Sequence, residues 1–210
     1  AQATRRPFAC PWCHAADMGD GDDDDGTEAR RKRLADQLED ESWEVRRDAA
    51  AELGSLGPAA EKFGVRLVGL ALRDGDKDVR AAAARAVGRL GEAAPGCAAQ
   101  LAEAAGDAER NVRRAAMEAL GLLVELAAPH AEQVAALLKD TSSGVRRAAT
   151  ETLTALGTAH TEEHLEDLAA LLGDRDSEVR RAAAVAVGEL GNAAAPAADP
   201  LAKLLQDPSP

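Results

Sequence analysis

The sequence predicts an all-α protein, an α-solenoid of antiparallel helix pairs with an extended amino-terminal arm. A Val-Arg pair recurs every 33 or 34 residues, an Asp lies five positions before each pair, and an Ala-rich stretch follows it. The 210 residues are 46% hydrophobic but only 2% aromatic. Because one globular core of this size normally uses more large side chains, helices packed closely through Ala and Leu fit this composition better.

The repeat is the strongest signal in the chain. The Val-Arg pairs are Val45-Arg46, Val79-Arg80, Val112-Arg113, Val145-Arg146 and Val179-Arg180. A sixth Asp, at Asp207, follows the five that precede these pairs. We therefore expect about five and a half repeats over residues 28–210, truncated in mid-repeat, so that further repeats or a neighbouring protein would cover that end.

Each repeat also carries start and stop signals for its second helix. Short oxygen-bearing side chains three positions before Val are candidate N-caps: Ser42, Asp76, Ser142 and Asp176. Glycines that can end the same helices are Gly57, Gly91, Gly157 and Gly191. In repeat three Val124 replaces this glycine, and we expect that helix to continue toward Pro129.

The pattern Asp-x4-Val-Arg, an Ala-rich stretch and Leu/Val-Gly-x-Leu-Gly, seen at 40–57 and 174–191, resembles short HEAT repeats of the phycobilisome-lyase type. The resemblance covers roughly residues 28–207 and implies a fold rather than one function, since that family includes lyase subunits, adaptors and assembly factors. It also implies a structural ladder in which Asp and Arg bond within and between repeats. The ladder residues are Asp40 with Arg46, Asp74 with Arg80, Asp107 with Arg113, Asp140 with Arg146 and Asp174 with Arg180.

A second Arg follows the Val-Arg pair in four repeats, and Ala81 interrupts this row. The four are Arg47, Arg114, Arg147 and Arg181. On stacked second helices they would align about 10 Å apart, along what is the concave face in HEAT solenoids. Such a ridge could bind acidic helices or phosphates of a partner. The alternative is that each Arg pairs with a nearby Glu or Asp and only solubilises its helix.

Cys97, His130 and His164 share one repeat position, ten residues before an Asp. Ligands on successive repeats would lie about 10 Å apart, whereas zinc needs ligands about 2 Å from one centre. We therefore expect a tolerant surface position here and no metal site.

Residues 1–27 do not follow the repeat and are expected to form an extended arm that docks on the solenoid or on a partner. They contain Cys10-Pro11-Trp12-Cys13-His14 and the acidic run 22–25. Besides a plain or disulfide-closed arm, Cys10, Cys13 and His14 suit a shared zinc site, a c-type haem attachment or a redox dithiol. We expect no cofactor, with zinc or c-type haem at these residues as alternatives.

Charge and hydropathy limit the classes of partner. A net charge of -12 argues against general nucleic-acid binding, which needs a dominant basic surface. No apolar run approaches the roughly 18 residues needed to span a bilayer. We expect a soluble protein, intracellular or organellar, compatible with peripheral association with a membrane complex.

No nucleophile-base pair, phosphate-binding loop or paired-carboxylate constellation stands out from the repeats. The sequence therefore favours a non-catalytic protein-protein interaction scaffold, a subunit or assembly factor that binds other subunits of a larger complex. One alternative is a chromophore- or haem-handling HEAT protein that uses the Cys-x-x-Cys-His segment. Another is the targeting module of a longer enzyme.

Overall fold

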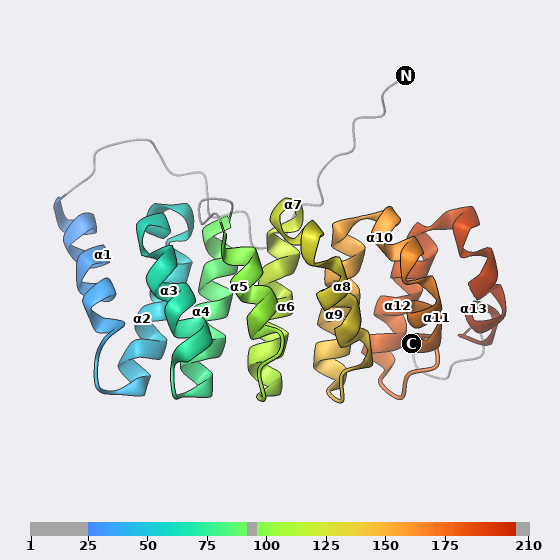
Figure 1. The fold of residues 1–210 in the computed structure, drawn as a ribbon, viewed down its shortest axis with the longest axis horizontal. Helices are drawn as coiled ribbons and strands as arrows, with labels where there is room; N and C mark the ends of the chain where they lie inside the picture. The colour runs from blue at the N-terminus through green and yellow to red at the C-terminus, as the bar shows by residue number, and fades with distance from the viewer. Residues whose placement is uncertain (1–24, 92–95, 205–210) are drawn as a thin grey trace, which may run out of the picture.

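The computed structural model describes residues 25–91 and 96–204, all of the elements in this part of the chain being helices and turns. The helix pairs stand side by side in one row that runs from α1 to α13 (Figure 1). The expected all-α solenoid is confirmed. Residues 1–24, which hold Cys10, Cys13, His14 and most of the expected arm, lie outside the described residues, and α1 begins at Asp25.

First and second helices form two layers (Figure 1). In each of the first three repeats, one first helix is followed by one second helix. The second helices run in similar directions. The first helices are α1 (Asp25–Gln37), α3 (Gly64–Arg73) and α5 (Cys97–Ala104). The second helices are α2 (Trp43–Ser55), α4 (Lys77–Leu90) and α6 (Arg110–Leu122). A 3-10 segment, Gly57–Phe63, leads from α2 into α3.

Repeats four and five divide the first layer into shorter pieces. Repeat four has α7 (Val124–Ala127) and α8 (Ala131–Ala136) before α9 (Ser143–Leu156). Repeat five has α10 (Thr158–Glu163) and α11 (Leu165–Leu171) before α12 (Ser177–Glu189). The 3-10 segment Gly191–Ala197 and α13 (Ala198–Leu204) begin a sixth unit.

Small residues bring the second helices into close contact. A β-carbon on Gly54 would lie 2.6 Å from the α-carbon of Ala86, and one on Gly88 would lie 2.6 Å from the α-carbon of Ala119. Each of these glycines is the first Gly of a Gly-x-Leu-Gly motif in its repeat. The motif therefore supplies the space in which α2 meets α4 and α4 meets α6, which explains why so few aromatic residues are needed.

The ends of the second helices follow most of the expected signals. Ser42, Asp76 and Asp176 accept hydrogen bonds from the first amides of their helices. The prediction for Ser142 is wrong, because its side chain accepts no such bond. Its backbone carbonyl accepts instead from the amides of Val145 and Arg146, each at 3.0 Å. The four predicted glycines have φ between 55° and 107°, the left-handed region that favours glycine.

The expected continuation of the second helix of repeat three toward Pro129 is also wrong. Helix α6 ends at Leu122, and Leu123 leaves helical geometry with φ -102° and ψ 40°. The turn places Leu123 in the core, where 1% of its surface is exposed. Burial of this large apolar side chain offsets the loss of helical hydrogen bonds at the break.

Candidate binding surface

The first arginine of each of the first four Val-Arg pairs joins its repeat to the next one. The guanidinium donates through Nε and Nη2 to both carboxylate oxygens of the next repeat's Asp, at 2.7–3.1 Å. The pairs are Arg46 with Asp74, Arg80 with Asp107, Arg113 with Asp140 and Arg146 with Asp174. Such bidentate pairs fix geometry as well as charge.

Inside a repeat, the same arginine binds backbone rather than carboxylate. Nη1 donates to the carbonyl of the Asp six positions earlier at 2.8–2.9 Å, from Arg46 to Asp40 through Arg180 to Asp174. That Asp accepts the amide two positions later through Oδ1, at 2.7–2.9 Å, which closes an Asx turn. The ladder residues thus shape their own turns, and the four inter-repeat pairs also fix the junctions between neighbouring repeats.

The ladder also sets the charge state of its aspartates. Burial by itself would raise the pKa of Asp140, but hydrogen bonds from Arg113 and from the amide of Ser142 outweigh it and lower the pKa below its usual value. The same balance lowers the pKa of Asp74, Asp107 and Asp174. Because the four arginines are only 14–19% exposed and fully engaged, the ladder is a structural element.

The second arginines are held more loosely. Each has an acidic neighbour on its own helix: Arg47 with Asp48, Arg114 with Glu118, Arg147 with Glu151 and Arg181 with Glu178. These side chains are 35–63% exposed, and the Arg114 pair, at 3.4 Å, is not a hydrogen bond. Exposed pairs of this kind contribute about 0–1 kcal/mol. A carboxylate from outside can therefore replace the local one at small cost.

Two of these arginines flank a hollow on the second-helix face. Arg47 on α2 and Arg114 on α6 line it from either side, and Ala81 and Ala82 of α4 lie between them. Its volume is about 480 Å³, and its remaining lining residues are Ala51, Asp78, Arg85 and Asn111. The interruption that Ala81 makes in the row of arginines leaves this space open. Three guanidinium groups and one carboxylate line the hollow, and the carboxylates that pair with these arginines, Asp48 and Glu118, are not among its lining residues.

Trp43 adds an aromatic ring beside the hollow. The Arg47 guanidinium carbon lies 5.2 Å from the centre of the Trp43 ring, within the range of a cation–π contact. This contact orients Arg47 while leaving its side chain 39% exposed.

Arg85 lies 3.2 Å from Glu118, the same carboxylate that neighbours Arg114. Arg85 was not among the predicted binding residues, although its place four positions after Ala81 puts it one turn along the same helix face.

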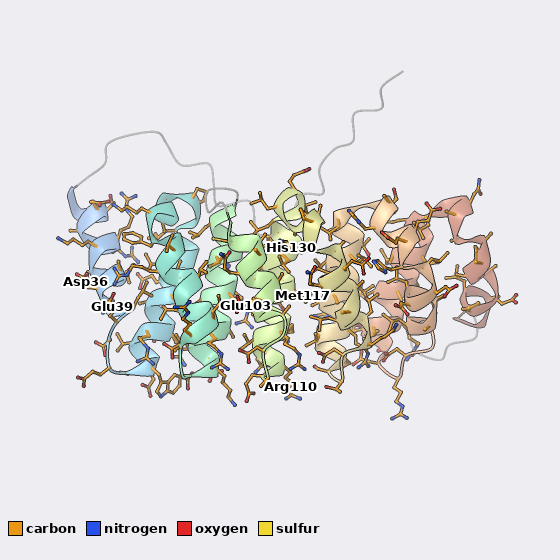
Figure 2. All side chains as sticks on the ribbon, in the orientation of Figure 1. Asp36, Glu39, Glu103, Arg110, Met117 and His130 are labelled. Atoms are coloured by element: carbon orange, nitrogen blue, oxygen red, sulfur yellow. The ribbon has the colours of Figure 1, made fainter. Side chains whose placement is uncertain are left out.

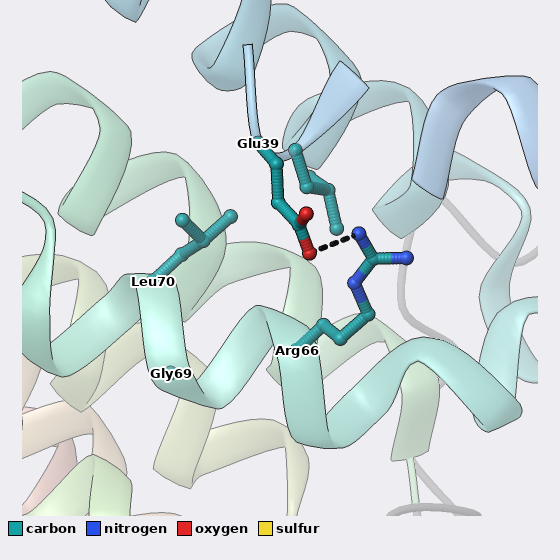
Figure 3. Close-up of a pocket in the computed structure, with 5 residues that line it drawn as sticks. Glu39, Arg66, Gly69 and Leu70 are labelled. Carbon is teal, nitrogen blue, oxygen red and sulfur yellow. Dashed lines mark hydrogen bonds and ion pairs between the residues drawn. The ribbon is translucent and has the colours of Figure 1, made fainter. Parts of the chain in front are cut away.

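A second, smaller hollow lies between the end of α1 and α3 (Figure 3). It measures about 210 Å³ and is lined by Leu38, Glu39, Arg66, Gly69 and Leu70. Arg66 donates to Glu39 at 2.6 Å across it. Its one cation and one anion neutralise each other, so this hollow offers less to a charged ligand than the one between Arg47 and Arg114.

The remaining residues that the sequence singled out lie at different places in the stack. Arg110 begins α6 at the edge that carries the ladder turns, and His130 lies toward the other edge (Figure 2). The expected surface position is wrong for Cys97, which is equivalent to His130 and His164 but is buried with 5% exposure. Burial raises the pKa of its thiol. Arg147 and Arg181 continue the basic row on α9 and α12 but do not line the hollow.

Among the described residues, no helix has the length and apolar character needed to cross a bilayer.

Comparison with known families gives one clear match. Residues 65–153 and 131–210 match the family model described as HEAT repeats, as the sequence resemblance predicted. Together these ranges span more than half of the chain. No curated protein sequence matches the chain significantly.

Solved structures with the same architecture include engineered and natural proteins. An engineered protein is 23% identical with a TM-score of 0.70, covering 85% of this chain and 90% of its own. The complex of CpcE and CpcF of phycocyanin lyase from Nostoc sp. PCC7120 is 22% identical with a TM-score of 0.65, covering 91% and 76%. A designed armadillo repeat protein in complex with the peptide (KR)4 is 21% identical with a TM-score of 0.63, covering 79% and 83%. At these identities the likeness concerns the fold.

Proposed function

The chain belongs to the HEAT-repeat family, and from this premise we propose that it is a non-catalytic scaffold that binds an acidic segment of another protein on its second-helix face. The observation that carries the proposal is the hollow between Arg47 and Arg114, where three guanidinium groups face one carboxylate. Repeat solenoids present extended surfaces of this kind to their partners. The partner would belong to a larger assembly in which this chain is a subunit or an assembly factor.

The lining of the hollow defines the chemistry of the segment. Arg47, Arg85 and Arg114 supply donors that match carboxylate oxygens in a planar, two-pronged geometry. Ala51, Ala81 and Ala82 supply an apolar patch between the cations. A peptide with closely spaced Glu or Asp residues would exchange the local ion pairs of Arg47 and Arg114 for its own carboxylates. Affinity then falls as salt rises, because the charges are partly exposed.

The test is a titration of the full chain with an octaglutamate peptide, followed by tryptophan fluorescence. Trp43 reports on Arg47, and a Trp12→Phe background removes the signal of the other tryptophan. We expect saturable binding that weakens about tenfold or more in an Arg47→Ser/Arg114→Ser variant, the equivalent of about 1.4 kcal/mol.

A matched variant separates this surface from the general charge of the chain. Arg147→Ser/Arg181→Ser also removes two positive charges from the row of second arginines, but at residues that do not line the hollow. We expect it to bind octaglutamate within about twofold of the parent, a difference below about 0.5 kcal/mol. Equal weakening in both variants, or no saturable binding, would contradict the proposal.

A further inference from the structure

A histidine and two glutamates from neighbouring repeats meet at the junction between repeats four and five. Glu132 is on α8, Glu163 is the last residue of α10, and His164 joins α10 to α11. Their donor atoms, one from each side chain, all lie within 4.8 Å of one another. The set therefore combines an imidazole nitrogen with two carboxylate oxygens contributed by two repeats.

The imidazole is placed as a ligand would be. The His164 side chain is 13% exposed, and its Nε2 is buried without a hydrogen-bond partner among the described residues. Oε1 of Glu132 is 3.9 Å from this nitrogen, too far for a hydrogen bond. Burying a polar atom with no partner costs free energy, so a group that binds Nε2 at this place would recover it.

The distances suit a small divalent metal ion after modest side-chain movement. Zinc binds His nitrogen and carboxylate oxygen at about 2.0–2.2 Å, which puts two ligands of a tetrahedral centre roughly 3.4 Å apart. The Glu132 side chain is 77% exposed and Glu163 is also exposed, so both carboxylates can close on the buried Nε2 by changing rotamer.

We propose that His164, Glu163 and Glu132 form a binding site for a divalent transition-metal ion, with zinc as the ion of best fit. The nitrogen and oxygen donors favour zinc and its first-row neighbours over calcium or magnesium, which take oxygen ligands. Three protein ligands leave a fourth position to water or to a partner's side chain. Since Glu132 belongs to repeat four and the other two ligands to repeat five, the ion clamps this junction.

The repeat register alone does not reveal this site. His164, His130 and Cys97 occupy equivalent positions of neighbouring repeats, and ligands so spaced cannot share one ion. The stacking of the repeats instead brings in Glu132, two positions after His130, while Glu163 directly precedes His164. The partners of His164 therefore come from outside its own register.

The test is calorimetric titration of the metal-stripped full chain with zinc, together with cobalt absorption as a probe of tetrahedral nitrogen and oxygen ligands. The Cys10→Ser/Cys13→Ser/His14→Ala background removes the other candidate zinc ligands. We expect one zinc ion per chain, loss of this binding in His164→Ala, and at least tenfold weaker binding in Glu132→Gln. His130→Ala, the control at the equivalent position one repeat earlier, is expected to bind as the background chain does.

Thermal unfolding provides a readout that does not depend on activity. Zinc should raise the unfolding temperature of the background chain and leave that of His164→Ala unchanged, because an ion that binds only the folded state stabilises it. Circular dichroism of the metal-free variants checks that each is folded. Absence of stoichiometric zinc binding in the background chain, or binding that survives in both His164→Ala and Glu132→Gln, would overturn the proposal.

Discussion

Gly88 of α4 and Ala119 of α6 are in such close contact that a β-carbon on Gly88 would lie 2.6 Å from the Ala119 α-carbon. The neighbouring atom is backbone and cannot rotate away. Gly88→Ala should therefore destabilise the protein by about 1–3 kcal/mol through overpacking, although Ala favours a helix by about 1 kcal/mol over Gly. Urea unfolding followed by circular dichroism measures the change.

Gly188 provides the matched control, because it occupies the same position of the repeat in α12 and a β-carbon there meets nothing within 4 Å. Gly188→Ala should raise the free energy of unfolding by about 0.5–1 kcal/mol. If both substitutions change stability in the same direction, close helix contact is not what the motif glycine provides.

The ladder predicts different costs for two equivalent aspartates. Asp140→Ala removes an Asx turn and the bidentate pair with Arg113, and should cost about 2–4 kcal/mol. Asp40→Ala removes the equivalent turn bond to Ser42, but no arginine of a preceding described repeat binds its carboxylate, so about 1 kcal/mol is expected. Equal losses in the two variants' unfolding curves would show that the inter-repeat pair contributes little.

Acid should unfold the protein through the same aspartates. The pKa of Asp74, Asp107, Asp140 and Asp174 is lower in the folded state than in the unfolded chain, where it is about 3.9. Their contribution is complete above the unfolded value and is lost as the pH falls through the folded values, since the unfolded chain then binds more protons. Stability measured by urea unfolding should fall from about pH 5 downward.

Asp140→Asn tests the source of this acid sensitivity, because Asn cannot titrate. Its free energy of unfolding should be lower than that of the parent at pH 7 and should decline less steeply below about pH 5. An unchanged slope would place the acid sensitivity in carboxylates outside the ladder.

Cys97 should react slowly with thiol reagents. It is 5% exposed, and burial raises the pKa of its thiol, whereas the thiolate is the reactive form. In a Cys10→Ser/Cys13→Ser chain, the only thiol should react many times more slowly in buffer than in urea. If the thiol reacted as fast in buffer as in urea, Cys97 would not be buried at the start of α5.

The recurring Val-Arg pair was sufficient to predict the period, the helix pairs and the family. The carboxylate that each ladder arginine binds depends on how one repeat stacks on the next. The sequence pattern does not contain this information. For the same reason the sequence identified Arg47 and Arg114 but not Arg85, which joins them only after α2, α4 and α6 are stacked. Ala81 interrupts the row of arginines, and its small side chain lines the hollow between Arg47 and Arg114.

The end of α6 and the cap of α9 were also beyond the pattern. Leu123 ends α6 because its side chain is taken into the core, a tertiary effect that overrides helix propensity. Ser142 stands at the expected cap position, but the carbonyl of the same residue satisfies the amides that its hydroxyl was expected to bind. Local signals placed Ser142 correctly at the start of α9 but did not determine which of its atoms accepts the hydrogen bonds.

The central claim, that an acidic segment binds between Arg47 and Arg114, is tested most directly by amide and side-chain NMR of the labelled full chain during titration with octaglutamate. The account predicts shifts concentrated at Arg47, Ala81, Ala82, Arg85 and Arg114, with the ladder guanidinium signals of Arg80 and Arg113 unmoved. Shifts spread evenly over all arginines of the described repeats, or centred on the ladder edge, would contradict it.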